Sequence, residues 1–387
     1  MSENDNSDAK LFRPQLSSQT VATLTRRLYG LHVLTSRELD SYDDRNFHIT
    51  VDDNDVQNAH LEALWPHGYV LKVLNSLDSK EPEVIKAKCD IILHAYRKGF
   101  PTPRPVPSTS GQLYALETLA REQPNDTGGG DTVETDVYLV RLFEFLPGTT
   151  LASVELTPTL AFQVGHYAAM LDNSLKDFDD SGCPELVVGW NMQTIPSLRN
   201  KLHAIKDPEK VKVVAEVIGE WEKILNRVIH SDFNDHNILV QSSVGVSSPS
   251  SSSLQEMDVC GILDFGDATK SLLIVEVAVA MTYMTVRCPV NFDPDKMAGH
   301  VLAGYLSEVR LPRSELQSLP ITVCARFSQS LTVGHYKLSL DPENSYIMVH
   351  ADKVWPHLHR LWSRPRDDTL DIWKSVVEDH GVTFPGD

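Results

Sequence analysis

Two short segments constrain the structure and chemistry of this chain more than any other part. The first reads Val228-Ile-His-Ser-Asp-Phe-Asn-Asp-His-Asn-Ile-Leu-Val240, and the second reads Gly261-Ile-Leu-Asp-Phe-Gly-Asp267. Each lies beside a short apolar run typical of a β-strand, over 238–240 and 259–263. If these runs pair as a hairpin, the acidic and amide side chains next to them come together.

The order and spacing of His230, Asp232, Asn237 and Asp264 match the H-x-D-x-x-x-x-N and D-F-G motifs of phosphoryl-transfer sites. Such a site needs a carboxylate near the attacking hydroxyl and separate oxygen ligands for the magnesium ion that bridges the phosphates. The pattern predicts Asp232 as the catalytic base and Asn237 and Asp264 as Mg²⁺ ligands. His230 is predicted to hold the loop by hydrogen bonds, not to act as an acid or base.

Length and composition indicate a cytoplasmic enzyme with two domains or lobes. A chain of 387 residues can bury a large core and ordinarily divides. Its five cysteines include no C-x-x-C pair, which argues against a disulfide framework or a zinc site. The acidic N-terminus lacks the features of a signal peptide. The longest apolar run, Leu272 to Val286, carries Glu276 and is short for a membrane span.

The net charge bears on the kind of partner. A formal charge of −18 argues against nucleic acid, which proteins bind mainly through clustered Lys and Arg. The charge is compatible with a cationic small substrate. Many acidic proteins are acidic for solubility alone, however, so the charge favours a small-molecule partner only weakly.

The pattern along the chain predicts an α+β protein. Residues 1–15 are expected to be disordered, 16–146 to form a small N-lobe with an antiparallel sheet plus a helix, and 147–387 to form a larger, mainly helical C-lobe. Exposed loops are expected over 121–135 and 242–253. The individual predictions are strands over 46–51 and 69–75, a buried strand that ends in a turn over 136–148, and helices over 18–29, 82–98, 157–175 and 208–226.

Lys72 lies in the predicted strand 69–75 between apolar neighbours, where a lysine can reach nucleotide phosphates. The alternative is an edge-strand lysine that points to solvent. In kinases, the helix that corresponds to 82–98 supplies a glutamate that pairs with this lysine. Lys88 occupies the expected position of that glutamate here, so the sequence does not identify the residue that pairs with Lys72. The main-chain groups around Phe143 to Leu146, Phe145 among them, are predicted to form the hinge that meets the nucleotide base.

On these motifs, together with Tyr138-Leu-Val-Arg-Leu142 and Ala325-Arg-Phe-Ser-Gln-Ser330, the chain resembles the aminoglycoside phosphotransferase superfamily, the small-molecule relatives of protein kinases. Within that superfamily it is similar to the hydroxylysine kinases. The resemblance implies a two-lobed protein-kinase-like fold. It also implies transfer of the γ-phosphoryl group of GTP, with ATP as the alternative donor, to 5-hydroxy-L-lysine. The products would be 5-phosphohydroxylysine and GDP, as in lysine degradation.

The resemblance implies that the turn from Ser41 to Phe47 covers the phosphates of the nucleotide, in place of a glycine-rich loop. This turn lacks a G-x-G-x-x-G pattern, so its backbone cannot approach phosphate freely, and the side chains of Ser41 and Asn46 are expected to contribute instead. The superfamily usually has glycine between the His and Asp of the catalytic loop, whereas this chain has Ser231. A serine there is expected to require a backbone that avoids positive φ.

A hydroxy amino acid needs a cation for its carboxylate and acidic groups for its amines. Asp235 and Arg326 are the candidates for these roles, and the alternative for Arg326 is a buried salt-bridge partner. Glu276 is predicted to anchor the catalytic loop, with core ion pairing as its alternative.

Three rival functions follow from the same motifs. A protein kinase is disfavoured because only four residues separate Asp267 from the apolar helix predicted near Leu272, too few for an activation segment. A kinase of homoserine or choline would share the fold, but choline calls for an aromatic cage that nothing near Asp232 indicates. The third rival is a non-catalytic pseudokinase that binds nucleotide. Ser231 and Lys88, which depart from the family pattern, favour it weakly.

Overall fold

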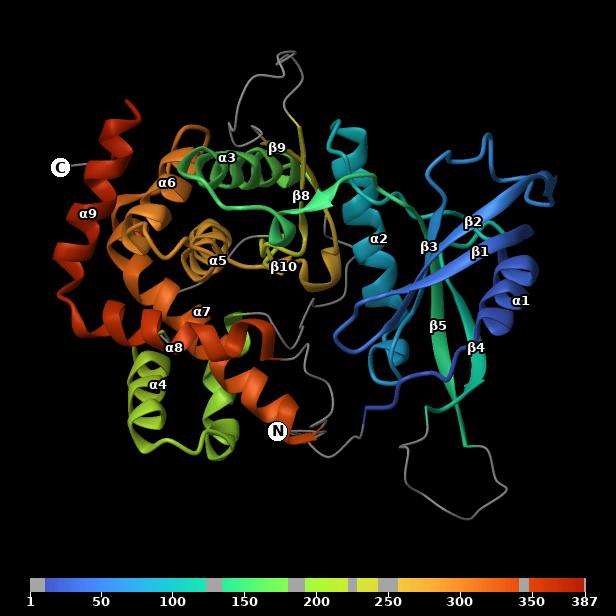
Figure 1. Ribbon diagram of the computed structural model, residues 1–387, viewed down its shortest axis with the longest axis horizontal. Helices are drawn as coiled ribbons and strands as arrows, with labels where there is room; N and C mark the ends of the chain where they lie inside the picture. Colours follow the sequence, from blue (N-terminus) through green and yellow to red (C-terminus); the bar gives the residue numbers. More distant parts are fainter. Residues whose placement is uncertain are drawn as a thin grey trace. The chain divides into compact units, whose positions relative to one another are not determined.

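The protein is described by a computed structural model that covers residues 11–122, 134–179, 192–221, 228–242, 257–340 and 348–385. The fold is α+β (Figure 1). Contacts divide the described residues into two compact units, the first comprising residues 11–96, 103–122 and 134–147. The second comprises residues 97–102 and the described residues from 148 onward.

The first unit is built on an antiparallel five-stranded sheet with the strand order β1-β2-β3-β5-β4. The central strand β3 carries Lys72, which pairs with Asn46 on β2 and with Arg141 on β5. These three side chains therefore share one face of the sheet. The strands are β1 (Leu31–Leu39), β2 (Arg45–Val56), β3 (Tyr69–Val73), β4 (Ala115–Ala120) and β5 (Thr135–Glu144).

One helix packs on each face of this sheet, as Figure 1 shows. Helix α1 (Ser18–Tyr29) begins after Ser17, whose hydroxyl accepts from the Thr20 N–H, and ends at Gly30 with φ 66°. Its apolar residues join alternate strand residues in one core cluster. Helix α2 (Pro82–Arg97) contributes Ile85 to a second cluster that includes Leu139.

The expectation of disorder over residues 1–15 is wrong for residues 11–15. The Gln15 N–H donates to the Ala120 carbonyl at 2.8 Å, and the Glu122 N–H donates to the Arg13 carbonyl at 2.8 Å. Pro14 also forms a bridge with Arg121. The segment runs along β4, the edge strand of the sheet, and satisfies main-chain groups that the edge would otherwise expose.

The second unit is mainly helical, with α5 (Leu273–Val286) at its centre (Figure 1). Residues 274–285 of α5 are all buried, as expected for a helix that is apolar on every side. The helices that accompany it are α3 (Pro158–Leu175), α4 (Pro208–Trp221), α6 (Pro294–Leu306), α7 (Arg313–Leu340), α8 (Met348–Ser363) and α9 (Arg366–Asp379).

Helices α3 and α6 touch backbone to backbone through two glycines. A Cβ atom added at Gly165 would lie 1.8 Å from the Val301 carbonyl oxygen, and one added at Gly304 would lie 1.8 Å from the Phe162 carbonyl oxygen. Each glycine therefore allows the other helix to approach more closely than any side chain would permit.

Short strands position the loops of the second unit. They form two small sheets, in the orders β10-β7 and β6-β8-β9. The predicted exposed loops over 121–135 and 242–253 lie, apart from their ends, outside the described residues, as does the predicted end of the helix over 208–226. The strands are β6 (Thr149–Thr150), β7 (Val228–Ile229), β8 (Ile238–Ser242), β9 (Met257–Ile262) and β10 (Thr269–Lys270).

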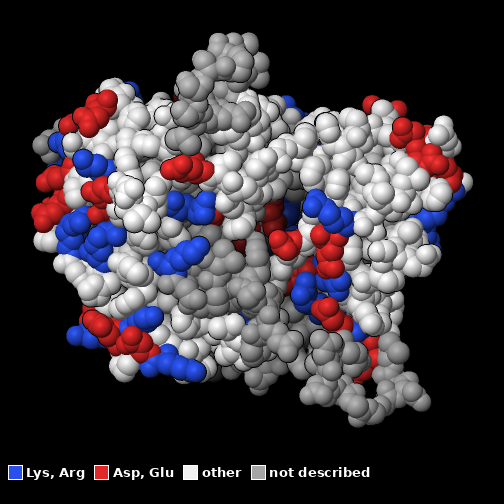
Figure 2. Space-filling model, viewed as in Figure 1, with Lys and Arg blue, Asp and Glu red and all other residues white. Residues whose placement is uncertain are grey.

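Two features describe the surface. In the part of the chain that the structure describes, no helix has the length and apolar character needed to cross a bilayer. Acidic and basic side chains are interspersed over the face drawn in Figure 2.

Candidate active site

Two loops of the second unit carry the predicted catalytic motifs. Residues 230–237 connect β7 to β8, and residues 263–268 connect β9 to β10. Strands β8 and β9 pair antiparallel, and the Leu263 N–H donates to the Asn237 carbonyl at 2.8 Å. Asn237 precedes β8 and Asp264 follows β9, so the hairpin brings both to the same end of the sheet.

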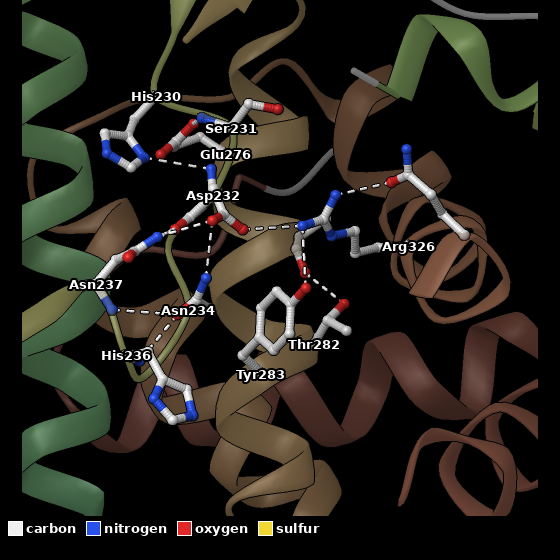
Figure 3. Close-up of polar contacts among 12 residues, drawn as sticks. His230, Ser231, Asp232, Asn234, His236, Asn237, Glu276, Thr282, Tyr283 and Arg326 are labelled. Atoms are coloured by element: carbon white, nitrogen blue, oxygen red, sulfur yellow. Dashed lines mark hydrogen bonds and ion pairs between the residues drawn. The ribbon is translucent and has the colours of Figure 1, made fainter. Parts of the chain in front are cut away.

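The carboxylate of Asp232 is held by three side-chain donors (Figure 3). Its Oδ1 accepts from Arg326 Nη2 at 3.0 Å. Its Oδ2 accepts from Asn234 Nδ2 at 2.8 Å and from Asn237 Nδ2 at 2.7 Å. The side chain keeps 17% exposure. Burial raises the pKa of the Asp232 carboxyl above its ordinary value, and the guanidinium of Arg326 opposes that shift.

Asn234 shapes the catalytic loop, a role that the sequence analysis missed. Its Oδ1 accepts from the His236 N–H at 2.8 Å and from the Asn237 N–H at 3.1 Å. This is the turn that an asparagine side chain makes with the backbone two residues on. The same amide donates to Asp232, so one residue fixes both the loop and the carboxylate.

Asn237 and Asp264 offer the oxygen ligands that Mg²⁺ prefers. Asn237 donates through Nδ2 to Asp232, which leaves Oδ1 as the atom able to bind a cation. Asp264 has φ 50°, a conformation that aspartate tolerates, and its exposed carboxylate accepts from the Gly266 N–H at 3.0 Å. The chemistry of this donor set fits a magnesium ion that takes its other ligands from phosphate and water.

His230 joins the two loops. Its Nε2 contacts the Leu263 carbonyl at 3.0 Å, and its Nδ1 accepts from the Asp232 N–H at 3.3 Å. Burial lowers the pKa of His230 to about 4, so the ring is neutral near pH 7. A neutral ring that accepts at Nδ1 donates from Nε2 to the carbonyl. Both ring nitrogens are thus used in structural hydrogen bonds.

Ser231 has φ 68°, so the expectation that this position avoids positive φ is wrong. The turn directs the Ser231 N–H onto the carboxylate of Glu276 on α5, with a donor–acceptor distance of 2.7 Å. A hydrogen bond from a buried N–H to a carboxylate is among the stronger ones in proteins and offsets the backbone strain. The sequence analysis had named Glu276 as the anchor of the catalytic loop but had treated the serine only as a departure from the family pattern.

Glu276 lies in a buried acidic pair with Asp172 on α3. Asp172 Oδ2 accepts from the hydroxyl of Tyr305. Burial raises the pKa of Asp172 to about 8. Burial, and then the charge of Asp172, raise the pKa of Glu276 well above its ordinary value. Two buried carboxyl groups that disfavour each other's charge each have a raised pKa.

Replacing Ser231 with glycine should stabilise the protein by about 1–2 kcal/mol, because glycine removes the cost of a left-handed backbone. The Ser231 hydroxyl is buried and has no hydrogen-bond partner among the described residues, so its loss also removes an unsatisfied group. Urea unfolding measures the change. Ser231→Ala is the control, because it removes only the hydroxyl and should gain less. A glycine variant less stable than the natural protein would contradict the account.

Asp235 and Arg326, the candidates for substrate recognition, are both buried and ion-paired. Asp235 is 1% exposed, and its Oδ2 lies 3.2 Å from Arg287 Nε. Arg326 is also 1% exposed and pairs with Asp232. Burial against a charged partner excludes both side chains from the surface, so the buried salt bridge considered for Arg326 is the arrangement found. Arg287, which also donates to the carbonyl of Ala152, was missed by the sequence analysis.

In the first unit, Lys72 pairs with Asp44, their Nζ and Oδ2 atoms 3.2 Å apart. Asp44 lies in the turn between β1 and β2, which also contains Ser41, and its Oδ1 accepts from the Asn75 N–H at 2.9 Å. The strand of Lys72 is internal and the side chain is 15% exposed, which excludes the solvent-facing alternative. Lys88 is buried on α2.

The stretch predicted to meet a nucleotide base uses much of its main chain within the first unit. The Glu144 N–H donates to the Arg104 carbonyl at 2.9 Å, and the Phe145 N–H donates to the Gly68 carbonyl at 3.0 Å. The Phe145 carbonyl accepts from Trp65 Nε1 at 2.7 Å. Phe143 lies within the β3–β5 ladder. The N–H and the carbonyl of Phe145 therefore each already make a hydrogen bond within the first unit.

Comparison with known proteins shows which family this chain is similar to. A model of the phosphotransferase enzyme family matches residues 39–307. The hydroxylysine kinase of Xenopus laevis is 34% identical over 388 residues, covering 96% of this chain and 96% of the relative. The hydroxylysine kinase of Bos taurus is 32% identical over 396 residues, covering 98% of each chain.

Solved structures share the fold at low sequence identity. The amicoumacin kinase hAmiN, in complex with AMP-PNP, Ca²⁺ and Ami, has a TM-score of 0.60 at 16% identity and covers 92% of this chain and 94% of its own. A microcompartment-associated aminopropanol kinase has a TM-score of 0.57 at 16% identity and covers 92% of this chain and 100% of its own. The family match and the full-length relatives together establish that this chain belongs to the phosphotransferase enzyme family of aminoglycoside phosphotransferase-like kinases, which act on an alcohol group.

Proposed function

We propose that this protein transfers the γ-phosphoryl group of GTP to the hydroxyl of 5-hydroxy-L-lysine, giving 5-phosphohydroxylysine and GDP in lysine degradation. Support comes from relatives named hydroxylysine kinase that are 30–34% identical over nearly the whole chain. The observation that carries the chemistry is the Asp232 carboxylate, which is fixed by three donors and still partly exposed. The proposal includes a cytoplasmic location.

Asp232 is the proposed catalytic base. The acceptor hydroxyl would approach its carboxylate within hydrogen-bond distance and lose its proton as the new O–P bond forms. The bond between the γ-phosphorus and the bridging oxygen breaks, and the nucleoside diphosphate leaves. Asn237 and Asp264 would hold Mg²⁺, which, when bound, neutralises charge on the phosphates. His230 and Glu276 would keep the loop in shape through their contacts with the Leu263 carbonyl and the Ser231 N–H.

Lys72 is the proposed phosphate ligand of the first unit. It shares a sheet face with Asn46, whose buried Oδ1 has no hydrogen-bond partner among the described residues. Asp44 holds the lysine side chain in place. Ser41, in the same turn as Asp44, remains a proposed phosphate contact. Asp44 is thus the proposed partner that orients Lys72, a role that the sequence analysis left open.

The base of the nucleotide would meet the stretch from Phe143 to Leu146. Since the N–H groups of Glu144 and Phe145 are used within the unit, the Leu146 N–H is the donor we propose for the base. No partner for it occurs among the described residues.

The function is tested by nucleoside diphosphate release from the purified protein with Mg²⁺. GTP or ATP is supplied with 5-hydroxy-L-lysine, lysine, homoserine, choline or no acceptor. Release that requires GTP and hydroxylysine is expected. Lysine is the matched control because it lacks only the hydroxyl. Turnover with homoserine or choline would reassign the acceptor, and bound nucleotide without turnover on any acceptor would indicate a pseudokinase.

A further inference from the structure

The guanidinium of Arg326 is fixed on three sides inside the second unit (Figure 3). Its Nη2 donates to Asp232 Oδ1 and to the Tyr283 hydroxyl, both at 3.0 Å. Its Nη1 donates to Gln329 Oε1 at 2.8 Å, and its Cζ lies 5.4 Å from the centre of the Tyr283 ring. A cation held in this way by α5 and α7 has one geometry in which to meet Asp232.

The acceptor sites of Asp232 can be counted. An ionised carboxylate has about four lone-pair positions, two on each oxygen. Oδ2 accepts from two amides, those of Asn234 and Asn237, and Oδ1 accepts from Arg326. Among the described residues nothing else donates to this carboxylate, so the remaining position lies on Oδ1. The 17% exposure of the side chain is consistent with access to it.

We infer that Arg326 is a positioning residue that presents the last lone pair of Asp232 Oδ1 to the acceptor hydroxyl. The inference rests on the proposed function and deepens it. The hydroxyl proton moves to Oδ1 as the acceptor oxygen bonds to the γ-phosphorus, and the electrons of the breaking P–O bond stay with the departing diphosphate. Arg326 neither gives nor takes a proton. It fixes which carboxylate oxygen faces the substrate.

This role differs from that of an ion pair that only joins α7 to the catalytic loop. If the ion pair only joined α7 to the loop, its loss would lower the stability of the protein. It would then change turnover by the same factor with Asp232 or with asparagine at that position. A positioning residue acts through the Asp232 carboxylate, so its loss should matter only while that carboxylate is present. Residues that act as one unit in catalysis show such non-additive effects.

The test compares Arg326→Gln, Arg326→Lys, Asp232→Asn and the Arg326→Gln/Asp232→Asn double variant of the full chain. We expect Arg326→Gln to lower kcat on the order of 10²-fold, as misplacement of a reacting group does. Nucleotide affinity should not change. Arg326→Lys should restore part of kcat and guards against a glutamine variant that fails to fold. The double variant should match Asp232→Asn alone.

Arg360→Gln is the matched control. Arg360 Nη2 lies 3.0 Å from Oδ1 of the buried carboxylate of Asp295, remote in sequence from the catalytic loop, and this variant should change Tm without changing kcat. Full kcat in both Arg326 variants, or effects that add in the double variant, would overturn the inference alone. A natural protein that phosphorylates no acceptor would remove the proposed function and this inference with it.

Discussion

An Asp232→Asn variant is expected to lose about 10²–10⁴-fold in kcat, the contribution typical of a general base. Asparagine keeps the size of the side chain but cannot take a proton. Both oxygens of Asp232 accept hydrogen bonds, one from Arg326 and the other from Asn234 and Asn237. The NH₂ group of an asparagine would replace one of these acceptors with a donor, so the hydrogen bonds on that side would be lost. Nucleotide affinity should stay unchanged, because no phosphate ligand is removed. Steady-state kinetics and nucleotide titration measure the two quantities.

The control for this variant is Asp258→Asn. Asp258 lies on β9 and accepts from Gln163 Nε2 at 2.8 Å, in the same unit but outside the catalytic loop. It should keep the kcat of the natural protein. Full turnover by Asp232→Asn would remove Asp232 from the chemistry. Loss of nucleotide binding together with a lower Tm would instead indicate a structural role.

Replacing Gly165 with alanine should destabilise the protein by more than about 3 kcal/mol, a large share of the roughly 5–15 kcal/mol of a typical domain. The new methyl group would lie 1.8 Å from the Val301 carbonyl oxygen. That oxygen belongs to the backbone of α6 and cannot rotate away, so α3 and α6 must separate. Gly304→Ala should act in the same way from the other side. Urea unfolding measures the loss.

Gly219→Ala provides the matched control within α4. The nearest atom to its added Cβ is Arg199 Nη2 at 3.5 Å, the end of a flexible side chain. Because alanine favours a helix over glycine, this variant should gain about 0.5–1 kcal/mol. Equal effects of the two substitutions would show that the contact between α3 and α6 does not depend on glycine.

Local features of the fold could be predicted from the sequence because nearby residues determine them. Helix α1 spans 18–29 as predicted, since Ser17 and Gly30 cap it. Helix α3 likewise begins after Thr157, whose hydroxyl accepts from the Leu160 N–H. The hairpin of β8 and β9 follows from two apolar runs that flank the motifs. Strand β1 was not predicted, because its alternation of buried and exposed residues is irregular.

Contacts between distant residues could not be predicted. Arg326 lies 94 positions after Asp232, and no pattern along the chain indicates that α7 passes the catalytic loop. Asp44, in the turn between β1 and β2, pairs with Lys72 on β3. The kinase pattern had suggested a partner from the helix that follows β3. The positive φ of Ser231 depends on a carboxylate from α5. Each of these requires the fold to be known first.

The most direct measurement is mass spectrometry of the acceptor after incubation of the purified protein with Mg²⁺, GTP and 5-hydroxy-L-lysine. The account predicts that 5-hydroxy-L-lysine gains one phosphoryl group in equal amount to the GDP released, and that lysine gains none. GDP release without a phosphorylated acceptor, or an unmodified acceptor with no GDP released, would contradict the proposed function.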